Sequence, residues 1–262
     1  MAGKACPATV HSLIADLTLD GPAGTVVDLG AGDGGTLAAI RGRSPASLLT
    51  ALDVDDTALA ALAARLPDTR IVRHDLAGRL PLPDGGVDVV VSHNTLECLT
   101  DPPALLADVA RALRPGGRAV LGHTDFESIL VATENRDLSR RVLLTYAELP
   151  VLYRHMAAAD PQMGRRLAGL VRRSPLRLES VHAHTTVLST LSEATTLRLG
   201  EVAVAVRRSA RRGLGHVTVG EVDEWQEQLR SADATGEFFF SETAFVVTAS
   251  RPAVPPEEQR WK

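Results

Sequence analysis

A glycine-rich segment near the start of the chain has the residue types of a nucleotide-binding loop. Residues 26–35 read VVDLGAGDGG, so an apolar run ends in a series of glycines. Glycine has no Cβ, which permits positive φ and lets the backbone approach a ligand closely. The helix expected from Thr36 would point its N–H groups and positive dipole at that ligand. Because Gly30, Gly32 and Gly35 fit G-x-G-x-x-G, the spacing alone leaves a dinucleotide site open.

Two carboxylates near this loop favour a different ligand. Asp28 precedes the first glycine by two residues, and its charge would oppose a pyrophosphate and favour a cation such as an amino acid ammonium. Asp53 ends the next apolar run, where a carboxylate can accept hydrogen bonds from two ribose hydroxyls. The pair predicts a nucleoside that carries positive charge. A loop-bracing role for Asp28 and a plain strand-end turn at Asp53 are the alternatives.

The elements that must position these residues alternate between strand and helix patterns. Short apolar runs predict strands at 25–29, 48–54, 70–73, 87–92 and 118–122. Helices are expected between them at 36–41, 56–65 and 103–113. We expect Asp56 to cap the second of these helices and Arg114-Pro115-Gly116-Gly117 to end the third. The alternation predicts an α/β fold with a doubly wound, mostly parallel, seven-stranded sheet, whose strands end at the edge where ligands bind.

The second half of the chain departs from this alternation. Residues 126–173 and 190–235 predict helices, with a break at 212–215, and residues 176–188 and 238–249 predict further strands. We therefore divide the chain into a cofactor-binding half at 1–125, a helical insertion at 126–175, core strands at 176–189 and 238–250, a second helical insertion at 190–237, and a tail at 251–262. The two insertions are expected to form a lid over the substrate.

Composition excludes several classes of protein. The chain has 262 residues, of which 45% are hydrophobic and 23% charged, as in ordinary globular domains. A net charge of −4 and an aromatic content of 3% argue against a nucleic-acid partner. Cys6 and Cys98 form no disulfide framework and lack metal-ligand spacing. No apolar stretch reaches about 18 residues, so we expect a cytoplasmic protein with no metal and no membrane partner.

Several segments, in the right order, resemble the class I S-adenosylmethionine-dependent methyltransferases with a Rossmann-like fold, in particular the small-molecule branch of ubiquinone and menaquinone methyltransferases. The matching segments are VVDLGAGDGG, LDVD, RHDLAGRLPLPDGGVDVVVSHNTLECL and LLADVARALRPGGRAVL, and they cover about residues 20–125. The resemblance implies S-adenosylmethionine as cofactor and methyl transfer to nitrogen or oxygen of a small metabolite, such as a natural-product intermediate. An NAD-dependent oxidoreductase and a non-catalytic methyltransferase-like scaffold are the alternatives.

The resemblance also implies roles for residues at the ends of the predicted strands. The loop would hold the methionine part of the cofactor, and the segments after the second, third and fourth strands would hold the ribose, the adenine and the sulfonium. In that order, these residues are Asp28, Gly30, Ala31, Gly32 and Gly34; Asp53 and Val54; His74, Asp75 and Leu76; and Ser92 and His93, with Asn94 beside the reacting methyl. The family often has histidine where Cys98 stands, so a role carried by that histidine does not transfer to this chain.

A general base is expected after the fifth strand. Methyl transfer needs a nucleophile held in line with the methyl group, exclusion of water and, for some acceptors, removal of a proton. His123 and Asp125 follow that strand in the segment GHTDFES. We expect His123 to act as the base and Asp125 to orient a substrate amine or hydroxyl. A hydrogen-bonded structural histidine is the alternative, and a homodimer is left open.

Overall fold

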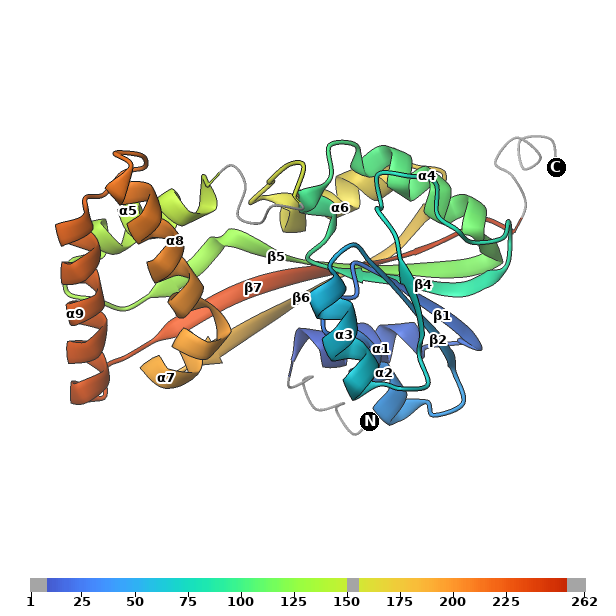
Figure 1. Ribbon diagram of the computed structural model, residues 1–262, viewed down its shortest axis with the longest axis horizontal. Coiled ribbons are helices and arrows are strands. Elements are labelled where there is room, and N and C mark those ends of the chain that lie inside the picture. The colour runs from blue at the N-terminus through green and yellow to red at the C-terminus, as the bar shows by residue number, and fades with distance from the viewer. Residues whose placement is uncertain (1–8, 150–155, 254–262) are drawn as a thin grey trace. The chain divides into compact units, whose positions relative to one another are not determined.

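The computed structural model describes residues 9–149 and 156–253 of the chain. These residues divide into two compact units (Figure 1). The larger unit contains the described residues up to 123, residues 163–184 and residues 244–253. The smaller unit contains residues 124–149, 156–162 and 185–243. Each unit has its own hydrophobic core.

Seven strands form one sheet in the order β3-β2-β1-β4-β5-β7-β6. The strands are β1 Thr25–Leu29, β2 Leu48–Asp53, β3 Arg70–Arg73, β4 Val87–His93, β5 Leu113–Val131, β6 Arg177–Leu188 and β7 Phe240–Ser250. The first five strands pair in parallel with one another. The Ser180 hydroxyl near the start of β6 bonds to that of Thr248 near the end of β7, and Arg251 after β7 donates its N–H to Gly117 near the start of β5. The mostly parallel, doubly wound sheet is therefore confirmed.

Helices cover both faces of the sheet in the larger unit. They are α1 Val10–Thr18, α2 Gly35–Arg43, α3 Asp56–Arg65, the 3-10 turn η1 Leu96–Cys98, α4 Pro102–Ala112 and α6 Met163–Arg172. Successive strand residues point to opposite faces, and accordingly Val26 packs in one core with Leu37 of α2, whereas Val27 packs in another with Leu106 of α4. Among the described residues, no helix combines the length and the apolar character that crossing a membrane would require.

The cap of α3 differs from the sequence prediction. The carboxylate of Asp55, and not that of Asp56, accepts the N–H groups of Thr57 and Ala58. Asp55 has the extended backbone of an N-cap, whereas Asp56 is already the first helical residue. The prediction that Asp56 caps the helix was therefore wrong by one position.

Strand β5 is much longer than the sequence predicted. It begins at Leu113 and runs to Val131, so residues 126–131 are extended and not helical. The segment at 114–117 ends α4, as expected, but is then taken into β5, where the pairing with β4 shifts register between Val87 and Val89. His123 and Asp125 consequently lie inside the strand and not after its end, which corrects their predicted placement.

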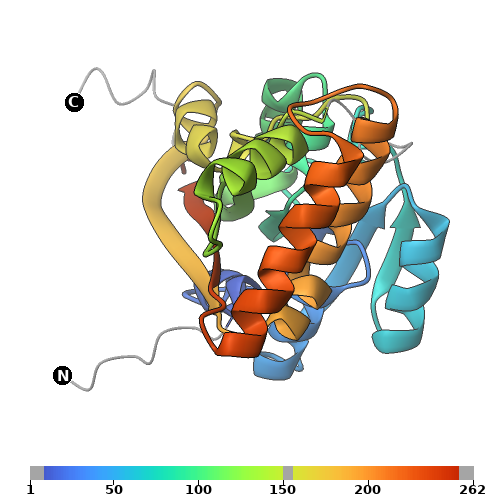
Figure 2. The ribbon, with the colours of Figure 1, turned by 90° about the vertical axis from the view of Figure 1, so that its left-hand side faces the viewer.

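The smaller unit is built on helices around one buried tryptophan. Its helices are α5 Arg136–Ala147, α7 Leu191–Ala194, the π-helical turn η2 Thr195–Leu199, α8 Gly200–Arg211 and α9 Val219–Thr235. Figure 2 shows α8 and α9 side by side. Trp225 of α9 is fully buried, and its indole N–H donates to the hydroxyl of Ser139 on α5 over 3.1 Å. That bond satisfies the one polar group of the largest side chain in this core.

Candidate cofactor-binding site

The loop between β1 and α2 places three alternate glycines in the left-handed region. Gly30, Gly32 and Gly34 have φ values of 71°, 53° and 84°. A Cβ at Gly30 would lie 2.2 Å from Oγ1 of Thr95, and one at Gly34 would lie 2.9 Å from Cγ of Leu62, so the fold itself requires these two glycines. A Cβ at Gly32 would meet nothing within 4 Å. The middle glycine therefore faces open space, where a ligand can approach the backbone.

Asp53 joins this loop to the end of β2. One carboxylate oxygen accepts the N–H of Gly32 at 2.8 Å, and the other accepts the N–H groups of Val54 at 2.7 Å and Asp55 at 2.9 Å. An ionised carboxylate has about four acceptor positions, so at least one remains for a ligand. The carboxylate is thus held in place by three backbone donors and can still accept a hydrogen bond from a hydroxyl.

Asp28 is a buried carboxyl group inside β1. Its exposure is 1%, and neither of its oxygens has a hydrogen-bond partner among the described residues. Burial, followed by the charge of Asp53, raises the pKa of Asp28 to about 8. A buried carboxyl without a partner is unfavourable in its ionised form. A cation bound nearby would remove that penalty, so the site fits a positively charged ligand.

The end of β4 closes one side of the loop. The Ser92 hydroxyl donates to the carbonyl of Leu29 at 2.8 Å, which commits it to holding β4 against the end of β1. Asn94 has a φ of 52°, which is rare for a residue with a side chain, and its N–H donates to Gly122 at 3.1 Å. Such strain concentrates at functional sites. The structure thus brings this segment next to the glycine loop.

The residues after β3 reach the same edge of the sheet. The N–H of His74 donates to the carbonyl of Asp53 at 2.8 Å, and its Nε2 is buried without a hydrogen-bond partner in the described part of the chain. Leu76 is buried and borders a cavity of about 310 Å³ that also contacts Leu99. Asp75 is exposed and accepts the N–H of Ala77, so its carboxylate turns back on its own loop.

His123 has a partner that the sequence analysis missed. Its Nε2 lies 3.5 Å from Oε1 of Glu97 in η1, and both side chains are buried. Glu97 carried no signal of its own, because only the tertiary structure brings η1 beside β5. Asp125 is also buried, accepts the N–H of Glu127 and belongs to the smaller unit.

Another missed residue lies on α1. Nδ1 of His11 is 2.9 Å from the hydroxyl of Thr36, and its ring meets that of His93 edge to face, with centroids 4.9 Å apart. Burial lowers the pKa of His11, although Asp33 raises it and Arg65 lowers it further. Since a neutral imidazole is favoured there, His11 brings no cation to a site that already holds buried acids. The sequence analysis assigned no element to residues 10–18 and gave no hint of this contact.

Cys98, where the family often has histidine, has an unreactive thiol. Burial, together with the charges of Glu97 and Asp53, raises the pKa of its thiol to about 12. The thiolate is the reactive form of cysteine, so Cys98 stays a neutral thiol near neutral pH. It therefore supplies neither a base nor a nucleophile to this site.

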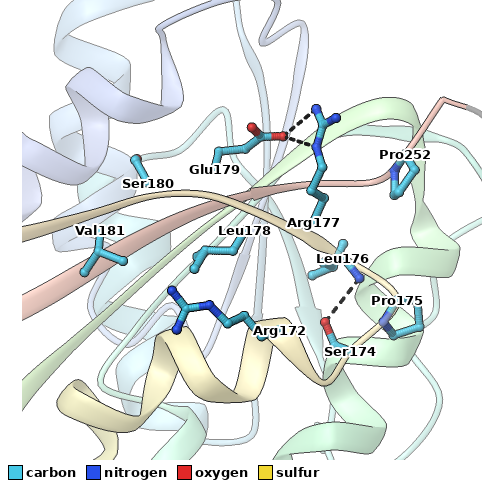
Figure 3. A pocket seen from close by; sticks show the side chains of 10 residues that line it. All are labelled: Arg172, Ser174, Pro175, Leu176, Arg177, Leu178, Glu179, Ser180, Val181 and Pro252. Atoms are coloured by element: carbon cyan, nitrogen blue, oxygen red, sulfur yellow. Dashed lines mark hydrogen bonds and ion pairs between the residues drawn. The ribbon is translucent and has the colours of Figure 1, made fainter. Parts of the chain in front are cut away.

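A second depression in the larger unit lies between the end of α6 and the start of β6 (Figure 3). Nε of Arg177 lies 2.9 Å from Oε1 of Glu179, and the Ser174 hydroxyl accepts the N–H of Leu176 at 3.2 Å. Its charged pair and its hydroxyl therefore satisfy one another or the backbone. We assign no ligand to this depression, in contrast to the loop beside Asp28.

Comparisons with known proteins agree with this geometry. A protein-family model described as a methyltransferase domain matches residues 27–121. An uncharacterized 37.1 kDa protein in transposon TN4556 of Streptomyces fradiae is 27% identical over 235 residues, which cover 87% of this chain and 63% of that protein. Trans-aconitate 2-methyltransferase of Rhizobium meliloti is 38% identical over 98 residues, 37% of either protein. The chain thus spans less than two thirds of the length of either relative.

A solved structure extends the likeness beyond the glycine loop. The S-adenosylmethionine-dependent methyltransferase of Mesorhizobium loti superposes with a TM-score of 0.51 at 22% identity, and the match covers 90% of this chain and 96% of that one. At 22% identity, this comparison shows a shared fold. Together with the matched domain at 27–121 and the strand order of the sheet, it leads to one conclusion. Residues 27–121 match a methyltransferase domain, and the resemblance of the chain to the class I S-adenosylmethionine-dependent methyltransferases is confirmed.

Proposed function

We propose that this protein transfers the methyl group of S-adenosylmethionine to a nitrogen or oxygen atom of a small metabolite. The observation that carries the proposal is Asp28, a buried carboxyl without a partner among the described residues, beside a carboxylate and an open glycine. S-adenosylmethionine supplies an electrophilic methyl on a sulfonium and also carries an ammonium group. A site whose unsatisfied groups are acidic suits such a cation and opposes a pyrophosphate.

In this proposal, the residues of the loop and the strand ends divide the work of binding. Asp28 faces the positive charge of the methionine part, and the backbone at Gly32 lies against the ligand. Asp53 accepts a hydrogen bond from a ribose hydroxyl at the acceptor position that its three backbone donors leave over. His74 and Leu76 contact the adenine, and His93 and Asn94 lie by the methyl group. Asp75, being exposed, is placed at the rim of this site.

His123 is the proposed proton acceptor. Nε2 of His123, the proposed acceptor atom, lies 3.5 Å from Oε1 of Glu97 in this buried place. Asp125 remains the proposed orienting group for the acceptor amine or hydroxyl. The sulfonium is reactive without further activation. The protein therefore has to hold the acceptor in line with the methyl group and to remove a proton from it.

The finer predictions rest on the sequence. The similarity to trans-aconitate 2-methyltransferase covers 37% of this chain and supports the cofactor. The ubiquinone-like branch, the lid formed by residues 126–175 and 190–237, the homodimer and the cytoplasmic location stay predictions. An NAD-dependent oxidoreductase is disfavoured by Asp28, because an acid at that position opposes a pyrophosphate.

Calorimetry with S-adenosylhomocysteine and with NADH tests the cofactor. We expect S-adenosylhomocysteine to bind and NADH not to bind. Asp53→Ala should weaken binding by about 1–3 kcal/mol through loss of charge-assisted hydrogen bonds. Asp56→Ala is the matched control, because Asp56 is an exposed carboxylate in the same segment whose one ion pair in the described part of the chain is with the exposed Arg73. Tight binding of NADH alone, or equal affinities of the two variants, would reject the proposal.

Turnover tests the base. With methyl-labelled cofactor and a fractionated metabolite extract as acceptor, His123→Ala should lower label transfer about a hundredfold while the affinity for S-adenosylhomocysteine changes little. Glu97→Gln should lower transfer less, because it removes only the charge beside the imidazole. Full transfer by His123→Ala in an accepting fraction would remove it from the mechanism.

A further inference from the structure

The smaller unit carries a groove within the insertion proposed as a lid, and no residue given a role in cofactor binding or proton transfer lines it. It is a cavity of about 610 Å³ lined by residues of α5, by the last residues of β5 and by Phe239. Its walls are mostly apolar, and Arg136 and Arg140 of α5 stand along one side. Ligand sites of this size combine apolar walls with a small number of placed polar groups. All of its lining residues belong to the smaller unit.

Large apolar side chains lie exposed in this groove. Leu130 is 60% exposed, and Leu144 and Phe239 are each 40% exposed. Single exposed apolar residues are common on protein surfaces, but several gathered in one concave place indicate a binding site. An apolar ligand in this groove would remove these side chains from water, and burial of apolar surface favours binding.

The two arginines give the groove a charge that the apolar walls do not explain. Neither Arg136 nor Arg140 has a hydrogen bond or ion pair among residues 9–149 and 156–253. Arg141, the next residue on the same helix, pairs with Asp137 at 3.0 Å and with Glu221 at 2.7 Å. The helix therefore neutralises the arginine that faces away from the groove and leaves unpaired the two that line it.

One acidic side chain also lines the groove. Oε1 of Glu127 accepts a hydrogen bond from Nε2 of Gln162 at 2.9 Å. Two guanidinium groups against one carboxylate leave a net positive charge. The groove therefore complements an anion.

Charge and apolar surface are separated along α5. Arg136, Arg140, Leu143 and Ala147 follow one another at intervals of three or four residues, so they share one face of the helix. At about 1.5 Å per residue, this face is roughly 16 Å long. It is positive at the start of the helix and apolar toward its end.

We propose that this groove binds a single-chain amphiphilic anion, with the carboxylate or phosphate head between Arg136 and Arg140 and the chain along Leu144, Leu130 and Phe239. This inference goes beyond the methyl transfer and does not depend on it. Charge complementarity and concavity favour this occupant over a flat anionic membrane surface, to which a groove presents little contact.

Calorimetry with dodecanoate below its micelle concentration, with dodecyl phosphate and with dodecanol tests the proposal on the full chain. We expect both anions to bind at one site and the alcohol to bind about tenfold more weakly. Arg136→Gln/Arg140→Gln should weaken dodecanoate binding about tenfold and abolish its advantage over dodecanol. Arg208→Gln/Arg211→Gln, which removes two exposed charges from α8 of the same unit, should bind as the wild type does.

Leu144→Asp provides a second variant, because it places a repelling charge at an exposed position without disturbing the core. It should abolish dodecanoate binding while the thermal unfolding and the affinity for S-adenosylhomocysteine stay as in the wild type. The proposal is overturned if dodecanoate does not bind, or if both double variants bind it equally. It is also overturned if the protein binds only vesicles of anionic lipid or forms dimers through this face. None of these results bears on the cofactor site.

Discussion

The two units each bury a carboxylate, and the surroundings of these carboxylates differ. Asp28 of the larger unit, 1% exposed, has no hydrogen-bond partner in the described part of the chain. Glu242 of the smaller unit, 7% exposed, accepts a hydrogen bond from Nε of Arg198 at 2.9 Å. A buried charge that the fold itself satisfies is structural, whereas one that the fold leaves unsatisfied marks a place for a ligand. The comparison separates two kinds of buried acid that look alike in the sequence.

The environment of Arg198 explains why it keeps its charge and satisfies Glu242. Arg198 lies in the π-helical turn η2, and its guanidinium carbon sits 5.0 Å from the centre of the Phe126 ring. Burial acts to lower its pKa, but the charge and hydrogen bond of Glu242 outweigh burial and raise it. The arginine therefore stays charged inside the core of the smaller unit.

The largest expected effect comes from removing one partner of the buried ion pair between Arg198 and Glu242. Arg198→Leu leaves Glu242 buried without its cation, so we expect the free energy of unfolding to fall by about 3–5 kcal/mol in denaturant titrations. The double variant Arg198→Leu/Glu242→Leu should recover most of this loss, because no buried charge then remains. A single variant as stable as the wild type would show that the pair is not structural.

Alanine substitutions at two glycines of the loop should have smaller effects on the free energy of unfolding. They distinguish the glycine that the fold requires from the one that the ligand requires. Gly30→Ala drives a Cβ into Thr95 at a positive φ and should lower the free energy of unfolding by about 2–4 kcal/mol. Gly32→Ala meets open space, so only the backbone cost of about 1–2 kcal/mol applies. The alanine at position 32 should nevertheless weaken S-adenosylhomocysteine binding at least tenfold by calorimetry. Wild-type affinity of that folded variant would show that the ligand does not approach this glycine.

Per unit of pH, the smallest effect is the change of stability that belongs to Asp28. Its pKa of about 8 lies above that of the unfolded chain, so raising the pH from about 5 to about 8 favours unfolding. The stabilising contribution is complete below the unfolded pKa and lost as the pH passes 8, by up to about 1.4 kcal/mol per pH unit. Asp28→Asn should remove this slope in unfolding titrations at several pH values.

Binding should show the opposite sign. S-adenosylhomocysteine has no sulfonium but keeps the ammonium group, which favours the ionised form of Asp28, so the affinity of the wild type for this ligand should rise as the pH approaches 8. Asp28→Asn should bind more weakly and without that rise. If the variant kept both the slope of stability and the pH dependence of binding, Asp28 would not be the titrating group.

Local patterns in the sequence determined much of the cofactor half. The strands from β1 to β4 and the helices between them agree with the predicted ranges to within one or two residues, because runs of apolar residues and glycine turns act over short distances. Asp28 and Asp53 could be placed at the loop for the same reason. The family followed from four such segments in order.

Tertiary structure decided what lies far apart along the chain. The extension of β5 to Val131, the approach of Glu97 to His123 and the contact of His11 with Thr36 all depend on elements that pack only in the folded chain. The sequence by itself determined which residues turn at the glycine loop and where its acids stand, since neighbours in the chain suffice for that. Only the tertiary structure decided which buried charges have partners, because a partner is supplied by an element elsewhere in the chain.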